Sequence, residues 1–68
     1  MTNLKLLKEE IERSGMTDTA IAKRSGMKRA TYYNRLAGKG EYKASEIHGI
    51  TKALRLTNAK RDAIFFAD

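Results

Sequence analysis

The sequence predicts an all-α fold, a compact bundle of five short helices that forms a single domain over residues 1–68. Apolar residues recur with helical spacing in five short segments, and no stretch alternates β-branched and polar residues as a strand would. No proline interrupts the chain. A chain of 68 residues has room for one hydrophobic core, and a hydrophobic content of 41% is enough to form it.

The first helix is predicted over residues 4–14, after a capping side chain from Thr2 or Asn3. Gly15 is expected to end this helix in the left-handed conformation that glycine adopts without steric cost. Three residues at helical spacing form one buried stripe, namely Leu4, Leu7 and Ile11. The carboxylates of the segment lie off that stripe and form a charged face, namely Glu9, Glu10 and Glu12.

The second and third helices are expected to be short and separated by glycine. Thr17 is a suitable cap for the second helix, which is predicted to end near Ser25 and Gly26. The third helix is predicted over residues 29–37 and is followed by Gly38. Its inward side is expected to come from Met27, Tyr32 and Leu36.

Two further helices complete the bundle. The fourth is predicted to begin at Ala44 or Ser45, and Thr57 is expected to cap the fifth. Their apolar positions are Ile47, Ile50 and Leu54 in the fourth helix and Ala59, Ala63, Ile64 and Phe66 in the fifth. Because Phe65 and Phe66 are adjacent, one of them is expected at the surface, where it would contact another subunit or another protein.

The net charge of +6 is confined to one part of the chain. Residues 23–43 contain seven Lys and Arg and one Glu, which accounts for the whole excess, and the remaining residues are balanced. Such a basic segment favours a polyanionic partner, and double-stranded nucleic acid is the first candidate.

The basic segment overlaps a predicted helix-turn-helix over residues 17–38. Ala22 is small where the two helices are expected to cross. Gly26 follows four residues later, where a tight turn requires a positive φ. The coincidence of this spacing with the positive charge favours DNA binding.

At these residues the chain resembles the lambda-repressor-like (Cro/C1-type, Xre) helix-turn-helix family. The similarity rests on Thr17, Ile21-Ala22, Gly26-Met27 and Leu36-Ala37-Gly38-Lys39, and it extends through the flanking helices over nearly the whole chain. The ending is most similar to small Cro-like and modulator-of-repression proteins of temperate phages of Gram-positive hosts. The resemblance implies a five-helix domain that binds operator DNA in a lysis/lysogeny switch.

Three positions depart from the family pattern. Lys28 stands where a capping Ser, Thr or Asn usually precedes the recognition helix. Asp18 replaces a Gln that donates to a phosphate in many members, and a carboxylate there would repel one. Lys43 replaces the usual Thr or Ser, so a reciprocal capping box with Glu46 is not expected.

The third helix would enter the major groove with its amino-terminal residues. Candidate base contacts on its outward face are Lys28, Arg29, Ala30, Tyr33 and Asn34. Arg29 can pair bidentately with guanine, and Asn34 can do so with adenine. Phosphate contacts are predicted for Lys23, Arg24, Arg35, Lys39 and Lys43.

Other classes of function find little support. There is no cysteine, and His48 has no second ligand at metal-binding spacing, so neither a metal site nor a cofactor is expected. No arrangement of nucleophile, base and acid suggests an enzyme. With no apolar run close to the ~20 residues of a membrane span and no signal peptide, we expect a location in the cytoplasm of a bacterial host cell.

Two functions therefore stay open. The first is a Cro-like transcriptional regulator that binds operator DNA, as a homodimer if the phenylalanine pair joins two subunits. The alternative is an antirepressor or modulator of repression, which would form a heteromeric complex with the cognate phage repressor and cover its DNA-reading surface. RNA binding is disfavoured because no aromatic platform on strands is evident.

Overall fold

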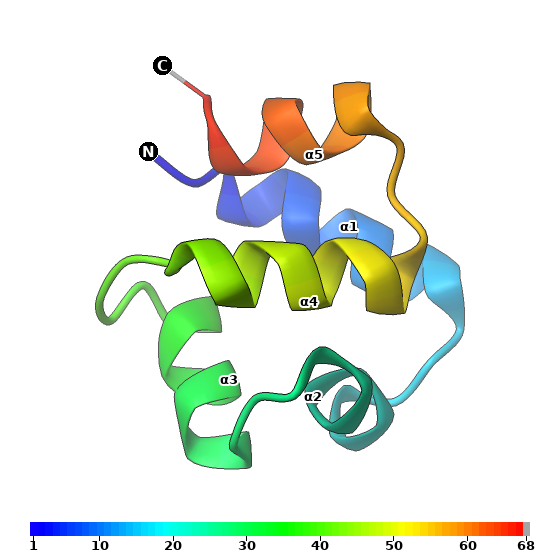
Figure 1. The fold of residues 1–68 in the computed structure, drawn as a ribbon, viewed down its shortest axis with the longest axis vertical. Helices are drawn as coiled ribbons and strands as arrows, with labels where there is room; N and C mark the ends of the chain where they lie inside the picture. Colours follow the sequence, from blue (N-terminus) through cyan, green and yellow to red (C-terminus); the bar gives the residue numbers. More distant parts are fainter. Residues whose placement is uncertain (68) are drawn as a thin grey trace.

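The computed structural model describes residues 1–67, which form five α-helices and no strand (Figure 1). The helices are α1 (Leu4–Ser14), α2 (Asp18–Ser25), α3 (Arg29–Leu36), α4 (Ala44–Leu54) and α5 (Asn58–Phe65). The predicted all-α class is confirmed, and the helix boundaries agree closely. α3 ends at Leu36, one residue before the predicted end.

Side-chain oxygens cap three of the five helices. Asn3 Oδ1 accepts from the Leu6 amide at 3.0 Å, and the hydroxyls of Thr17 and Thr57 accept from amides at the starts of α2 and α5, each at 3.1 Å. α3 and α4 instead follow lysines, whose ammonium groups can accept no hydrogen bond. Three helix starts thus have a side-chain oxygen as a cap, and the starts of α3 and α4 do not.

Left-handed residues end α1, α2 and α4. Gly15 and Gly26 have φ of +70° and +73°, as expected from the sequence. At the end of α4 the same conformation falls on Arg55, with φ of +54°. The Leu56 amide then donates to the Thr51 carbonyl at 2.9 Å, the hydrogen bond that closes a Schellman motif.

α4 is the central helix of the bundle. In Figure 1 it passes between α1 and α5 on one side and α2 and α3 on the other. It contributes Ile50 to one buried cluster and Ala53 to a second. The first cluster also contains Leu7, Ile64 and Phe65, and the second contains Ile21, Ala22 and Tyr32. Both halves of the core are thereby joined through α4.

α2 and α4 approach each other closely at Gly49. A Cβ atom added at Gly49 would lie 2.2 Å from the Ser25 carbonyl oxygen, which is closer than any real side chain permits. The sequence placed the tight crossing between the second and third helices at Ala22. Ala22 is buried in a cluster that contains both Tyr32 of α3 and Ala53 of α4, so it packs toward both helices. Only glycine at position 49 allows this approach.

The two ends of the described chain lie side by side. The Met1 ammonium donates to the Ala67 carbonyl at 2.9 Å, and the Asn3 amide donates to the Ile64 carbonyl at 2.6 Å. Figure 1 places these ends opposite α2 and α3 along the longest dimension of the molecule, which extends 27 Å.

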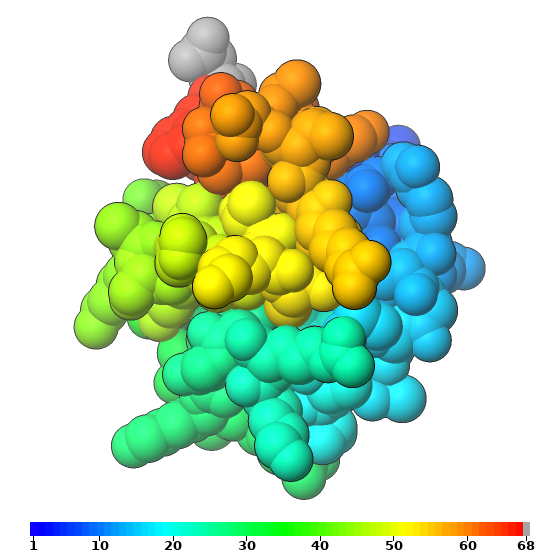
Figure 2. Space-filling view, turned by 45° about the vertical axis from the view of Figure 1, so that its right-hand side comes forward, coloured from blue at the N-terminus to red at the C-terminus, as the bar shows by residue number. Residues whose placement is uncertain are grey.

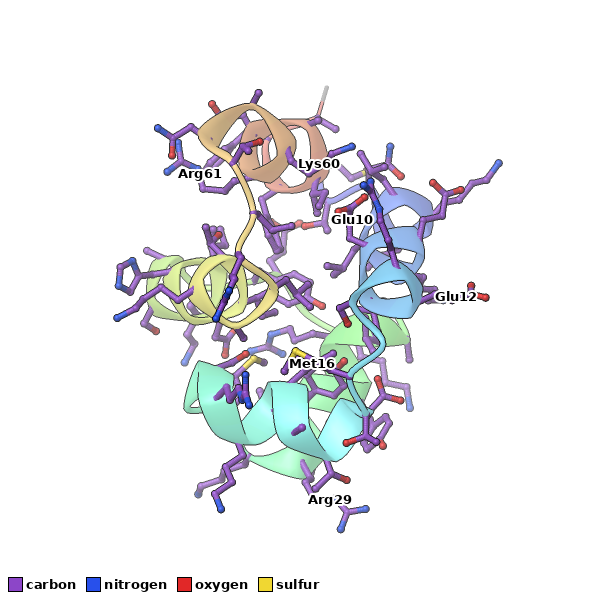
Figure 3. All side chains as sticks on the ribbon, turned by 90° about the vertical axis from the view of Figure 1, so that its right-hand side faces the viewer. Glu10, Glu12, Met16, Arg29, Lys60 and Arg61 are labelled. Atoms are coloured by element: carbon purple, nitrogen blue, oxygen red, sulfur yellow. The ribbon has the colours of Figure 1, made fainter. Side chains whose placement is uncertain are left out.

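An ion pair also links α1 to α5. The Glu10 carboxylate lies 3.7 Å from the Lys60 ammonium and 2.6 Å from the Arg13 guanidinium. Figure 3 shows Lys60 beside Glu10, whereas Glu12 points away from α5. One member of the predicted acidic face is therefore engaged within the fold.

Candidate nucleic-acid interface

α2 and α3 are joined by a short turn at Gly26. The Gly26 amide donates to the Lys23 carbonyl at 3.2 Å, and the Met27 amide donates to the Ala22 carbonyl at 2.9 Å. These two bonds form a Schellman motif, and the positive φ of Gly26 makes it possible. Lys28 then turns into extended backbone before α3 begins.

Two residues on the inner side of α3 fix its orientation. Tyr32 is fully buried, and Leu36 is partly buried against both core clusters. The rotation of α3 about its axis is thereby set, and the opposite side is left to solvent. The five predicted base contacts are all exposed, namely Lys28, Arg29, Ala30, Tyr33 and Asn34.

Two of these side chains have a defined placement. Figure 3 shows Arg29 pointing away from the body of the protein at the end formed by α2 and α3. Tyr33 is 44% exposed, and its ring meets the Tyr32 ring edge-on at a centroid distance of 5.4 Å. The buried ring thus supports the exposed one, so Tyr33 is held in position on the outer side of α3.

The amino end of α3 has no side-chain cap, as expected from Lys28. The first amides of a helix carry partial positive charge, and the Lys28 ammonium adds a full charge at the same end. An anion that approaches α3 from this end would meet both.

The Asp18 carboxylate is held by a tyrosine within the fold. The Tyr32 hydroxyl donates to Asp18 Oδ1 at 2.8 Å, which ties the start of α2 to α3. Burial of the phenol, followed by the neighbouring carboxylate, raises the pKa of Tyr32 well above its ordinary value, so it stays protonated and keeps donating. The carboxylate is thus hydrogen-bonded toward the protein interior.

Arg35 does not extend into solvent as the other predicted phosphate contacts do. Its Nε lies 3.1 Å from Glu46 Oε1, and the two side chains are only 17% and 12% exposed. Arg35 Nη1 also donates to the Lys39 carbonyl at 3.2 Å. The guanidinium thus connects α3, the following loop and α4, and the phosphate contact of Arg35 stays a prediction.

Glu46 also supplies half of a capping box at the start of α4. Its Oε1 accepts from the Lys43 amide at 2.9 Å, and the reverse bond is absent because an ammonium group has no acceptor. Burial opposes ionisation, but the hydrogen bond from Lys43 and the Arg35 guanidinium outweigh it and hold the pKa of Glu46 below its ordinary value. The Glu46 carboxylate therefore stays ionised, and its charge is paired with the Arg35 guanidinium.

The other cations of the basic segment are available. Lys23, Arg24, Lys39 and Lys43 are exposed, and within residues 1–67 none of them forms an ion pair. Figure 2 shows long side chains of the cyan and green part of the chain projecting from the end opposite α5. Positive charge is thus concentrated around α3 and the loop that follows it.

Two residues with hydroxyl groups also lie in this region, and neither was predicted from the sequence as a site residue. A hollow of about 280 Å³ lies where the α2–α3 turn meets the start of α4, and its lining includes Lys28, Thr31, Lys43 and Ser45. Thr31 and Ser45 occupy the first turns of α3 and α4. In the sequence, only their positions near the starts of two predicted helices could have indicated a role in the site. The fold is what brings the two helix starts together.

The phenylalanine pair lies elsewhere on the molecule. Phe65 is 5% exposed and belongs to the core, whereas Phe66 is 59% exposed. One ring of the pair is therefore at the surface, as expected; Phe65 packs inside, and a partner contact stays a prediction for Phe66.

His48 is exposed on α4. Across residues 1–67, no three His, Cys, Asp or Glu side chains are placed to hold a metal ion. None of the five helices combines the length and the apolar character that a membrane span requires, as far as the described part of the chain goes.

Comparisons of the chain with protein-family models, with curated proteins and with solved structures give no match.

Proposed function

We propose that this protein is a sequence-specific DNA-binding regulator of the helix-turn-helix type, a Cro-like phage regulator in which α3 enters the major groove of an operator. The observation that carries the proposal is the outer side of α3. It presents Arg29, Tyr33 and Asn34 to solvent, among exposed cations of the basic segment that form no ion pair within residues 1–67, namely Lys23, Arg24, Lys28, Lys39 and Lys43.

Electrostatics supports this assignment because two carboxylates that contact α3 are engaged within the fold. Asp18 accepts from Tyr32, and Glu46 is paired with Arg35. A phosphate backbone that approaches α3 would meet an excess of positive charge, since residues 23–43 contain seven Lys and Arg and one Glu. Such charge supplies most of the sequence-independent part of DNA affinity.

The side chains on α3 also match the hydrogen-bonding patterns of base edges. Arg29 has the fork of donors that pairs with guanine O6 and N7, and Asn34 has the donor and acceptor that adenine requires. Each such pair provides about 1–3 kcal/mol of discrimination against the wrong base. The Ala30 methyl group suits contact with the methyl group of thymine.

The test is a titration of the protein against phage-switch promoter DNA and against random duplex over a range of salt concentrations. Contacts from Lys23, Arg24, Lys28, Lys39 and Lys43 predict that log affinity falls with log salt at a slope of about −4.5. Equal affinity for promoter and random duplex would rule the proposal out.

Two variants separate sequence reading from phosphate contact. Arg29→Ala is expected to relax the preference at one base pair by about 1–3 kcal/mol. Lys23→Ala is expected to weaken binding to both DNAs equally and to reduce the slope by about 0.9. Lys8→Ala serves as the matched control, because Lys8 is exposed on α1 outside the basic segment, and it is expected to change neither quantity.

The exposed ring of Tyr33 favours a second candidate function. Tyrosine and arginine are enriched among the residues that dominate protein–protein affinity, and Tyr33 lies beside Arg29 and Lys28 in this region. An antirepressor or modulator of repression would use this region to bind the cognate phage repressor. Co-purification with the repressor encoded beside it, abolished by Tyr33→Ala, would favour this function over DNA binding.

A further inference from the structure

The end of α4 has a backbone conformation that glycine supplies elsewhere in this chain. Among residues 1–67, Arg55 is the one residue other than glycine with a positive φ, at +54°. The same conformation at the ends of α1 and α2 falls on Gly15 and Gly26. A side chain disfavours this conformation because its Cβ atom crowds the following carbonyl oxygen. Since glycine would relieve the strain, an arginine at this position indicates a function for its side chain.

The Arg55 side chain lies close to that of Arg24. Both arginines line a hollow of about 280 Å³ where the end of α4 meets α2, together with the apolar residues Met16, Ala53 and Leu54. Both arginines are exposed, and within residues 1–67 neither forms an ion pair. Like charges repel one another, so their proximity is unfavourable unless an anion binds between them.

A third cation lies at the same end of α4. Lys52 belongs to the last turn of the helix, three positions before Arg55. It is exposed and likewise has no ion-pair partner in the described part of the chain. We refer to Arg24, Lys52 and Arg55 as the α2–α4 ridge.

The fold separates charges that balance in the sequence. Outside residues 23–43 the chain has no net charge, but Lys52 and Arg55 lie beside α2, next to the basic segment. Two carboxylates of α1 are directed elsewhere: Glu10 is paired with Arg13 and Lys60, and Figure 3 shows Glu12 on the side of α1 away from α4. The positive surface therefore extends beyond the segment that the sequence defines.

We infer that the α2–α4 ridge binds the phosphate backbone of the DNA that flanks the segment read by α3. The inference rests on the proposed function. Arg24 belongs both to the basic segment and to the ridge, so it connects the surface around α3 to Lys52 and Arg55. In Figure 1, α4 lies one layer beyond α2 from the end at which Figure 3 shows Arg29. The flanking duplex must therefore curve toward α4 to reach the ridge.

A phosphate backbone suits the ridge better than an acidic protein does. Double-stranded DNA carries one negative charge per ~1.7 Å of helix axis, so a single duplex can contact α3 and the ridge at once. An acidic protein would have to match each of the two surfaces separately.

The experiment is a fluorescence anisotropy titration of two labelled promoter duplexes at several salt concentrations. One has about 10 base pairs, a single helical turn for α3 and its nearest phosphates, and the other has about 30 base pairs. On the long duplex, Lys52 and Arg55 are expected to steepen the slope of log affinity against log salt from about −4.5 to about −6.3. Each variant is compared with the wild type on the same duplex, so end effects of the short duplex cancel.

Arg55→Gly is the decisive variant because its expected effects on stability and on binding have opposite signs. Glycine relieves the left-handed conformation, so the melting temperature is expected to rise by about 5 °C. Loss of one phosphate contact is expected to weaken binding to the long duplex about 8-fold at 0.1 M salt, with no change on the short duplex. A misfolded variant cannot produce this combination. Arg55→Lys keeps the charge and is expected to keep the affinity.

Lys52→Ala tests the ridge without a change of backbone at Arg55, and it is expected to weaken binding to the long duplex by a similar factor. Lys8→Ala is the matched control, because Lys8 is exposed on α1, and it is expected to have no effect.

Two results would overturn the inference. One is an Arg55→Gly variant that binds the long duplex as tightly as the wild type, which would leave the ridge to an acidic protein. The other is an equal loss on both duplexes, which would place the Arg55 contact beside α3 and not in the flank. Equal affinity for promoter and random duplex would instead overturn the proposed function alone, because each variant is compared with the wild type on one DNA.

Discussion

Two tyrosines in this protein have similar surroundings but different hydrogen bonding. The Tyr32 hydroxyl donates to Asp18, whereas the buried Tyr42 hydroxyl has no partner within residues 1–67. Burial, and next the Glu46 charge, raise the pKa of Tyr42 to about 12, so both phenols are neutral at physiological pH. Substitution of each tyrosine by phenylalanine therefore separates the contribution of the hydrogen bond to stability from the contribution of the packed ring.

Tyr32→Phe is expected to lower the free energy of unfolding by about 1.5–3 kcal/mol, because it removes a hydrogen bond to a charged group. Tyr42→Phe is expected to leave stability unchanged or slightly raised, since only an unpaired hydroxyl is lost. Urea denaturation of both variants measures the difference. Equal losses would contradict the assigned role of the Asp18 contact.

The approach of α2 to α4 depends on a single glycine. Gly49→Ala would place a Cβ atom 2.2 Å from the Ser25 carbonyl oxygen, so the two helices must separate. We expect a loss of about 3 kcal/mol in the free energy of unfolding, at the upper end of ordinary overpacking. His48→Ala, next to it on the exposed side of α4, is expected to change stability by less than about 0.5 kcal/mol. Thermal or urea denaturation of both variants provides the check, and similar losses would refute the role of the crossing.

The connection between α3 and α4 is expected to weaken in acid. The folded state lowers the pKa of Glu46, so the pair with Arg35 stabilises the fold above the unfolded pKa. This contribution is lost as the pH falls below the ordinary value of 4.5 and through the folded pKa. Glu46→Gln should be less stable than the wild type at pH 7 and should approach it near pH 3. Urea denaturation between these two values tests this, and a difference independent of pH would exclude the ion pair as its source.

The helices were predictable where their ends are encoded locally. Thr17, Thr57 and Gly26 act within three or four residues of their own positions, so the sequence alone located those boundaries. The end of α4 was less apparent, because Arg55 adopts a conformation that glycine usually provides. The boundaries set by capping threonines and by glycine were therefore predictable, whereas the end of α4 lacks the glycine that would have indicated it.

The candidate site was predictable only in part. The exposed side of α3 follows from helical spacing once Tyr32 and Leu36 are assigned to the core. The engagement of Arg35 by Glu46 depends on how α3 lies against α4, since the two residues are eleven positions apart. The same holds for the contact between Gly49 and Ser25, which no residue spacing in the sequence predicts.

The arrangement of the bundle separates its two candidate surfaces. α4 connects both halves of the core, with α3 on one side and α5 on the other. The basic segment and the exposed Phe66 consequently lie at different ends of a molecule with extents of 27 × 24 × 19 Å. A partner bound at one end leaves the other end accessible.

The adjacency of the chain ends has a consequence for topology. Because the Met1 ammonium meets the Ala67 carbonyl, a short linker would close the backbone into a ring without moving a helix. Closing a loop of this length removes conformational freedom from the unfolded chain worth about 4 kcal/mol in the entropic description of cross-links. A circular form prepared by enzymatic ligation is therefore expected to melt at a higher temperature than the linear chain, with α3 unobstructed. An unchanged melting temperature would mean that the ends separate in solution.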